Sequence, residues 1–120
     1  MSTRSFIGVT QPNGEIAAVY CHFDNYQNFE ILVKNYNSYK QAMDLIDLGD
    51  MSFLGETLDK CTFYSRDQGE SEEETKAELF SCISEFLMKC HEDYTFLWDG
   101  NEWRWRQWTK PLSAKAINEN

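Results

Sequence analysis

The sequence predicts an α+β domain in which a mainly antiparallel sheet packs against two or three helices. Three observations favour this class. Alternating apolar and polar residues around an Asn-Gly or Asp-Gly turn predict a β-hairpin near each end of the chain. A short segment rich in Thr, Phe and Tyr predicts one more strand in the middle. Apolar residues at three- and four-residue steps predict helices between these strands.

The N-terminal hairpin is expected from strands at residues 5–10 and 16–23. Pro12-Asn13-Gly14 lies between them. Proline presets φ for a turn, and Asn-Gly tolerates the positive φ that a tight hairpin requires. We therefore expect the two segments to pair directly.

Two helices are expected next, over residues 28–36 and 38–48, because each segment repeats apolar residues on one face. Ser38 is a good N-cap residue for the second helix. Gly49 follows that helix directly and predicts its C-terminal end.

The centre of the chain predicts a loop over residues 51–59, a strand over 60–65 and then the longest helix, from Ser71 to His91. Ser71 and Glu74 fit a capping box, and three glutamates occupy the first turn, where the helix dipole favours negative charge. The core-facing stripe of this helix would consist of Leu79, Phe80, Ile83, Phe86, Leu87 and Cys90.

The C-terminal hairpin is expected from residues 94–98 and 102–108, joined by the turn Asp99-Gly100-Asn101. Hydrophobic residues make up 42% of the 120-residue chain, enough for one core. The sequence has no internal repeat and no linker. We expect one domain over residues 1–111 and a frayed tail over residues 112–120.

Charge is distributed unevenly along the chain. The net charge is −9, but residues 44–102 hold sixteen acidic and four basic residues, a local net charge of −12. Such a surface repels nucleic acid and membranes and favours basic partners. The alternative is a solvated surface that serves solubility alone.

The compartment is expected to be the cytoplasm, because no segment approaches ~18 consecutive apolar residues and the N-terminus does not fit a signal peptide. The four cysteines, Cys21, Cys61, Cys82 and Cys90, are then expected to be reduced. None has the spacing of a structural zinc site, so we expect no metal and no cofactor.

Residues 3–8 read Thr-Arg-Ser-Phe-Ile-Gly, and residues 19–26 read Val-Tyr-Cys-His-Phe-Asp-Asn-Tyr. In these two segments most clearly, the chain resembles a group of small proteins from bacteriophages and prophages. Asn25 stands where the group tends to have Gly, and Asn also tolerates the left-handed region. Further matches lie at residues 48–55, residues 64–70 and the Asp99-Gly100 turn. The resemblance implies a phage setting, hence a host cytoplasm, and no particular reaction.

Two surfaces are candidates for partner binding. The first is the charged stretch before and within the expected long helix, where a row of helical carboxylates at Glu74, Glu78 and Glu85 would imitate the phosphate spacing of a duplex. Its residues are Arg66, Asp67, Glu70, Glu72, Glu73, Glu74 and Glu78. The second is the C-terminal hairpin, whose one face would carry Trp103 and Trp105. The other face would present Arg104, Arg106 and Trp108, residue types enriched in interface hot spots.

A possible pocket is formed by Tyr20, His22, Asp24 and Tyr26, the densest group of reactive side chains. On a strand, Tyr20, His22 and Asp24 share one face, and a His beside a carboxylate can act as a general base. The alternative is a strand end whose His and Asp bond to the next loop.

These observations favour a phage accessory protein that binds and inhibits a host protein, such as a defence enzyme or another nucleic-acid-binding enzyme. It would use the acidic, nucleic-acid-mimicking surface and the Trp/Arg hairpin, and would bind neither nucleic acid nor membrane directly. Two alternatives remain open: a protein that binds or sequesters a small molecule, and a small enzyme centred on His22 and Asp24.

Overall fold

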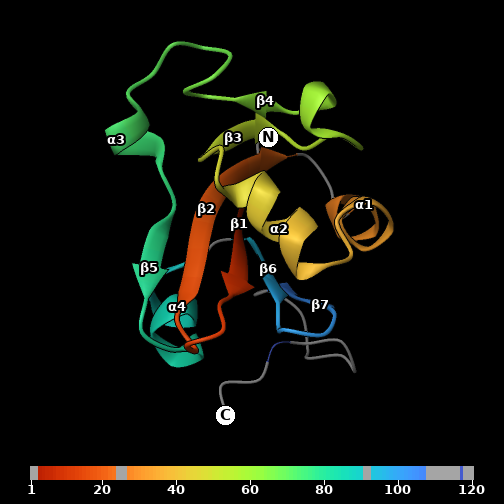
Figure 1. Cartoon of the computed structure of the whole chain (residues 1–120), viewed down its shortest axis with the longest axis vertical. Coiled ribbons are helices and arrows are strands. Elements are labelled where there is room, and N and C mark those ends of the chain that lie inside the picture. The colour runs from red at the N-terminus through yellow and green to blue at the C-terminus, as the bar shows by residue number, and fades with distance from the viewer. Residues whose placement is uncertain (1–2, 24–26, 91–92, 108–116, 118–120) are drawn as a thin grey trace.

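The computed structural model describes residues 3–23, 27–90, 93–107 and 117. Within these residues seven strands form one mixed sheet, with helices on both faces (Figure 1). The strands are β1 (Thr3–Thr10), β2 (Ile16–Phe23), β3 (Met51–Phe53), β4 (Thr62–Phe63), β5 (Glu78–Phe80), β6 (Tyr94–Trp98) and β7 (Trp103–Gln107). The helices are α1 (Gln27–Asn35), α2 (Tyr39–Ile46), α3 (Glu72–Thr75) and α4 (Ile83–Lys89), with a 3₁₀ turn, η1, at Leu58–Lys60. The α+β class is confirmed.

The two hairpins predicted from turn chemistry are present. β1 and β2 pair antiparallel from Thr3↔Phe23 to Thr10↔Ile16, and Gly14 in their turn has φ +91°. β6 and β7 pair antiparallel, and Asp99 Oδ1 accepts hydrogen bonds from the backbone N–H groups of Asn101 and Glu102, both at 2.8 Å. Local residues therefore determine both reversals.

The centre of the sheet is a parallel pair that joins the two hairpins. β1 lies beside β6, in register from Ser5↔Tyr94 to Val9↔Trp98. The strand order is β4-β3-β2-β1-β6-β7, and β5 pairs with β2 outside that sequence of neighbours. Three of the pairings within this order are antiparallel, and the β1–β6 and β2–β3 pairings are parallel.

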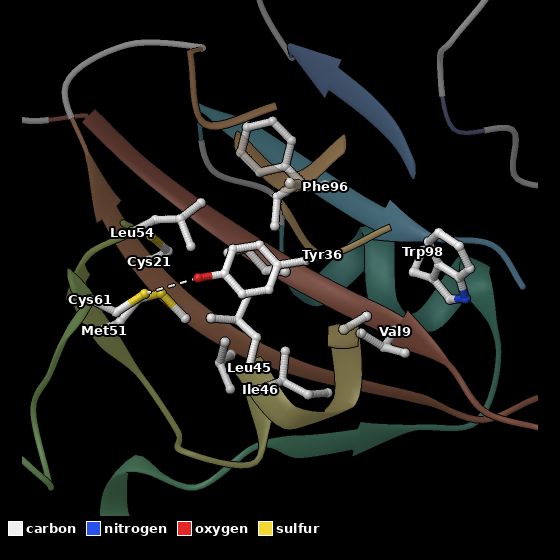
Figure 2. Close-up of a cluster of buried hydrophobic side chains, with 14 of the residues drawn as sticks. Val9, Cys21, Tyr36, Leu45, Ile46, Met51, Leu54, Cys61, Phe96 and Trp98 are labelled. Atoms are coloured by element: carbon white, nitrogen blue, oxygen red, sulfur yellow. Dashed lines mark hydrogen bonds between the residues drawn. The ribbon is translucent and has the colours of Figure 1, made fainter. Parts of the chain in front are cut away.

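One face of the sheet is covered by α1 and α2 and holds the larger core. Tyr36 lies at its centre, among the side chains drawn in Figure 2. Its hydroxyl donates to the Gly55 carbonyl at 2.8 Å and lies 3.5 Å from Cys61 Sγ. The indole Nε1–H of Trp103 donates to the Tyr36 carbonyl at 2.9 Å. These polar groups of Tyr36 and Trp103 are thus hydrogen-bonded, as most buried polar groups are, whereas the buried Nε1 of Trp98 in the same core has no partner among the described residues.

The opposite face holds a second core under α4. Phe86 and Leu87 of α4 pack with Ile16 of β2 and Leu97 of β6. Gly8 permits this approach, because a Cβ there would lie 2.7 Å from the Phe86 ring. Alternate residues of a strand point to opposite faces, so β2 contributes Ile16 and Ala18 to this core, and Ala17, Val19 and Cys21 to the other.

The single long helix expected from Ser71 to His91 is wrong. The segment forms α3, then the extended strand β5, then α4. β5 pairs with β2 through Ile16↔Phe80 and Ala18↔Glu78, so hydrogen bonds to a free sheet edge replace those of a continuous helix. Of the expected stripe, Phe80, Phe86, Leu87 and Cys90 are buried, Ile83 is half-buried, and Leu79 is 59% exposed.

Smaller corrections concern the middle of the chain. The expected loop over residues 51–59 contains β3, and the strand expected over residues 60–65 is reduced to Thr62–Phe63. The Ser38 N-cap is confirmed, since its Oγ accepts from the Gln41 backbone N–H at 3.1 Å. Gly49, with φ +90°, follows α2 as expected.

The tail expected over residues 112–120 lies outside the described residues except for Ile117, which is buried in the second core. Among the helices of the described part of the chain, none combines the length and the apolar character that crossing a membrane requires.

Candidate functional site

A cavity of about 560 Å³ opens where the outer edge of β2 changes partners. β5 pairs with residues 16–18 of β2, and β3 pairs with Cys21, so none of the described strands lies beside the edge between these points. The cavity takes its walls from β2, α3, β5 and α4. Its lining residues are Phe6, Ala18, Tyr20, Asp50, Glu73, Glu74, Lys76, Ala77, Glu78, Leu79, Phe80, Lys89 and Cys90.

The floor of the cavity is aromatic. Phe6 and Tyr20 are cross-strand neighbours, and their ring centroids lie 5.8 Å apart in an edge-to-face arrangement. The Tyr20 hydroxyl lies 3.2 Å from His22 Nδ1. The expectation that Tyr20 and His22 share a face is therefore confirmed, and Tyr20 lines the cavity. Asp24 and Tyr26, the other residues of the expected pocket, lie outside the described residues.

Asp50 closes the gap between β5 and β3. Its Oδ1 accepts a hydrogen bond from the backbone N–H of Tyr20 at 2.8 Å, which takes the place of a neighbouring strand. The Asp50 backbone N–H donates to the Thr75 carbonyl at 2.7 Å, and its carbonyl accepts from the Tyr64 N–H at 3.1 Å. One residue thus holds β2, the end of α3 and the segment after β4 together.

The surroundings of the Asp50 carboxyl group disfavour its charged form. Its pKa is raised to about 6, mainly by burial and also by the charges of Glu78 and Glu70, while the hydrogen bond from the Tyr20 N–H acts in the opposite direction. A half-buried carboxylate among other carboxylates gains more from a bound cation than an exposed one does. No described residue donates a hydrogen bond to its second oxygen, Oδ2.

The acidic segment, defined as Glu70, Glu72, Glu73, Glu74 and Glu78, is exposed along its whole length. Glu73, Glu74 and Glu78 line the cavity. Glu72 and Glu73 line a neighbouring hollow of about 350 Å³, with Arg66. The ion pair described within the segment joins Lys76 Nζ to Glu73 Oε1 at 2.7 Å.

The expected helical row of Glu74, Glu78 and Glu85 does not form. Glu74 is in α3, Glu78 is in β5 and Glu85 is in α4. Glu85 Oε1 accepts from the Ser81 backbone N–H at 3.1 Å, so it caps the start of its own helix. Glu74 and Glu78 therefore line the cavity, Glu85 does not, and the three carboxylates do not follow one helix face.

Arg66 and Asp67 stabilise their own loop. Arg66 pairs with both carboxylate oxygens of Asp67 at 3.0 Å, and its Nη2 donates to the Cys61 carbonyl at 3.0 Å. The Asp67 carboxylate accepts from the Phe63 N–H at 2.8 Å. The hydrogen bonds from Arg66 and from the Phe63 N–H lower the pKa of Asp67.

The C-terminal hairpin divides as the alternation predicted. Trp103 is buried and Trp105 packs on the larger core, while Arg104 and Arg106 are half-buried. Arg104 Nε pairs with Asp99 at 2.7 Å and its Nη2 with Glu102 at 3.3 Å, so its charge is neutralised within its own hairpin. Trp108 lies outside the described residues. β7 is three strand positions from β2, about 14 Å at the usual spacing, so the structure does not bring the hairpin arginines to the cavity.

The described part of the chain holds no cluster of metal ligands, and two of its cysteines are poorly suited to nucleophilic attack. No group of three or more His, Cys, Asp or Glu side chains is arranged there to hold a metal ion. Burial raises the pKa of the Cys90 thiol to about 12 and also raises that of Cys21, which disfavours the thiolate needed for nucleophilic attack.

Asp50, Phe6 and Lys89 line the cavity and are not anticipated from the sequence. The signal for Asp50 was its position directly after Gly49, between a helix end and an apolar segment. Phe6 read as an ordinary strand residue, and Lys89 as the last turn of a helix.

Comparison of the chain with protein-family models, with curated proteins and with solved structures gives no match in any of the three.

Proposed function

We propose that the protein is a binding module that holds a basic partner at the acidic segment and the cavity beside it. One observation supports this proposal: Glu73, Glu74 and Glu78 line the same cavity as the half-buried Asp50. Five glutamates and one lysine between residues 70 and 78 give a local net charge of −4. A surface of one sign around a concave site attracts and orients a partner of the opposite sign.

The resemblance to phage proteins supports a setting for this binding. We propose that the partner is a host protein in the host cytoplasm and that binding inhibits it. Nucleic-acid-binding enzymes, including those of host defence, are suitable targets because their functional surfaces are basic. The proposed mimicry of nucleic acid rests on charge, since the helical spacing of carboxylates is absent.

Binding of a small molecule is the second candidate. The cavity volume of about 560 Å³ falls within the range of ordinary ligand pockets, and its lining combines aromatic and charged side chains. The enzyme alternative has no comparable support, because His22 does not line the cavity and its described contact is with Tyr20.

The proposal is tested with a charge-matched pair of variants. Glu72, Glu73 and Glu74 are changed together to Gln in one variant, and Glu30→Gln, Glu56→Gln and Asp59→Asn are combined in the control. All six side chains are exposed, and each variant changes the net charge from −9 to −6. The control includes α1, which lies across the molecule from α3 (Figure 1).

A partner captured from bacterial host lysate and then purified should bind the first variant at least tenfold more weakly than the original protein. It should bind the control variant within threefold, and binding should weaken as salt is raised from 0.1 M to 1 M, where the Debye length falls from about 10 Å to about 3 Å. Equal binding by both variants would show that the acidic segment serves solubility alone.

A further inference from the structure

We propose that the cavity binds a guanidinium or primary ammonium group, with the cation against Asp50 and Glu78 and its apolar stem against the rings of Phe6 and Tyr20. This inference rests on the proposed function, because it names the chemical group through which a basic partner would engage. It concerns the cavity beside β2 and not the exposed carboxylates of the segment as a whole.

The charges around the cavity favour a cation. Asp50, Glu73, Glu74 and Glu78 supply four negative charges, and Lys76 and Lys89 supply two positive ones, leaving −2. Lys76 is already paired with Glu73. Three carboxylates then remain, those of Asp50, Glu74 and Glu78, together with the ammonium group of Lys89. A ligand cation would balance this excess of negative charge.

Asp50 is positioned to accept from such a ligand. Its Oδ1 is fixed by the Tyr20 N–H, and its backbone is fixed by Thr75 and Tyr64, so the carboxylate is held in place before any ligand arrives. Oδ2 has no donor among the described residues. A hydrogen bond between two charged groups is roughly twice as strong as one between neutral groups, and a prepositioned acceptor loses little entropy on binding.

The aromatic floor suits the remainder of an organic cation and not a bare metal ion. Phe6 and Tyr20 present ring surface beside the carboxylates, and Ala18 and Phe80 extend the apolar lining. A guanidinium or ammonium group gains a further attraction over an aromatic face, and its methylene stem buries apolar area. A hard metal ion would instead require several oxygen ligands close together, and no such group occurs in the described residues.

The same chemistry has two sources: an arginine or lysine side chain of a partner protein, and a free amine or guanidine. A volume of about 560 Å³ exceeds what one side chain fills and leaves room for the residues next to it. The experiment therefore compares butylguanidine, a free guanidine with one positive charge, with the capped tripeptide acetyl-Ala-Arg-Ala-amide, and each with its uncharged analogue, in which a urea replaces the guanidinium.

The binding of these probes to the full chain is followed by two-dimensional NMR of backbone amides at low salt. Saturable shifts centred on Tyr20 and residues 77–79 are expected for at least one charged probe, with at least a tenfold weaker dissociation constant for its uncharged analogue. Tighter binding of the tripeptide would identify a partner's side chain as the source, and tighter binding of butylguanidine would identify a free guanidine.

Three variants test the assigned residues. Asp50→Asn keeps an acceptor for the Tyr20 N–H while removing the charge, and Glu78→Gln serves if that variant fails to fold; each should weaken the charged probe at least fivefold. Lys89→Gln, an exposed cavity residue, should tighten it at least twofold because a like charge is removed. The control Glu56→Gln lies outside the cavity and should change nothing.

The inference is overturned if no charged probe gives saturable shifts at the cavity, if charged and uncharged probes bind equally, or if the cavity variants bind the charged probe as the original protein does. The proposed function fails separately. Suppose that a partner protein binds the Asp50→Asn and Glu78→Gln variants normally and fails to bind the variant changed at Glu72, Glu73 and Glu74. That result would support the acidic segment as the binding surface and refute the cavity as the site of the cation.

Discussion

The two faces of the sheet differ in how completely they are covered. On the face of α1 and α2, the described polar atoms of Tyr36 and Trp103 are paired inside a continuous core. On the other face, among the described residues, the seven-residue helix α4 covers the second core, and an acidic cavity opens beside it. β2 serves both faces, because Val19 and Cys21 point into the closed core while Ala18 and Tyr20 point to the open side. The alternation of one strand thus separates residues needed for stability from residues available for binding.

The largest expected effect tests whether α4 packs against the sheet on the face that holds the cavity. Phe86 is fully buried, so Phe86→Ala should lower the free energy of unfolding by about 3–5 kcal/mol, the usual range for truncating a buried aromatic residue. Met88, on the same helix, is 76% exposed, and Met88→Ala should change it by less than about 0.5 kcal/mol. Denaturant unfolding measures both. A loss under 1 kcal/mol for Phe86→Ala would place α4 away from the sheet.

A smaller effect is expected from the Tyr36 hydroxyl, in the core under α1 and α2. Tyr36→Phe removes the hydrogen bond to the buried Gly55 carbonyl and should cost about 1–3 kcal/mol, the penalty for leaving a buried acceptor without its donor. Tyr39→Phe is the matched control, because Tyr39 is exposed on α2. If chemical denaturation finds the two variants equally stable, the Tyr36 hydroxyl contributes nothing to the core.

The open face should also respond to pH through Asp50. Its pKa rises from 3.8 to about 6 on folding, so the folded state holds the proton more tightly than the unfolded state does. The resulting stabilisation is complete below about pH 4 and is lost as pH rises through about 6. Asp50→Asn removes this dependence. The unfolding free energy of the original protein minus that of the variant should therefore fall between pH 4 and pH 7, as thermal unfolding at several pH values would show.

Other charged groups near Asp50 set the size of that change. Glu78 and Glu70 act on its carboxyl directly, and Tyr64 lies close enough for Asp50 to raise the pKa of the phenol. Since these groups are present in both proteins, their own titration largely cancels in the difference. A difference that rises with pH instead would mean that a cationic neighbour dominates the site.

The smallest effect, that of Leu79→Ala, distinguishes β5 from a continuous helix. Leu79→Ala should change the unfolding free energy by less than about 0.5 kcal/mol because the side chain is mostly exposed, whereas Phe80→Ala should cost about 3–5 kcal/mol. In the helix predicted from sequence, both residues would belong to the buried stripe and both would matter. Comparable large losses would restore that helix.

The parts of the fold that sequence predicted are those determined by neighbours along the chain. Asn13-Gly14 and Asp99-Gly100 specify their turns through backbone φ and Asx hydrogen bonds, and Ser38 specifies the start of α2. The prediction of one long helix was wrong because the spacing of the apolar residues in this segment fits a continuous helix throughout. The free edge of β2, which lies sixty residues away in sequence, selects an extended conformation at residues 78–80.

The candidate site was predicted in its residue types but not in its arrangement. Tyr20 and Glu73, Glu74 and Glu78 were named from sequence as belonging to separate regions, and the structure places them around one cavity. Asp50 gave almost no signal because its role consists of contacts with Tyr20, Tyr64 and Thr75, each at least 14 residues distant. Such a role arises only from tertiary structure.

The parallel pairing of β1 with β6 also governs how the chain folds during synthesis. Its first partners, Ser5 and Tyr94, are separated by 89 residues. At about 5–20 residues per second, a ribosome needs roughly 4–18 s to make β6 after β1. During that interval the inner edge of β1 has no strand beside it and can pair with another nascent chain. Slow folding dominated by long-range contacts follows from this single central pair.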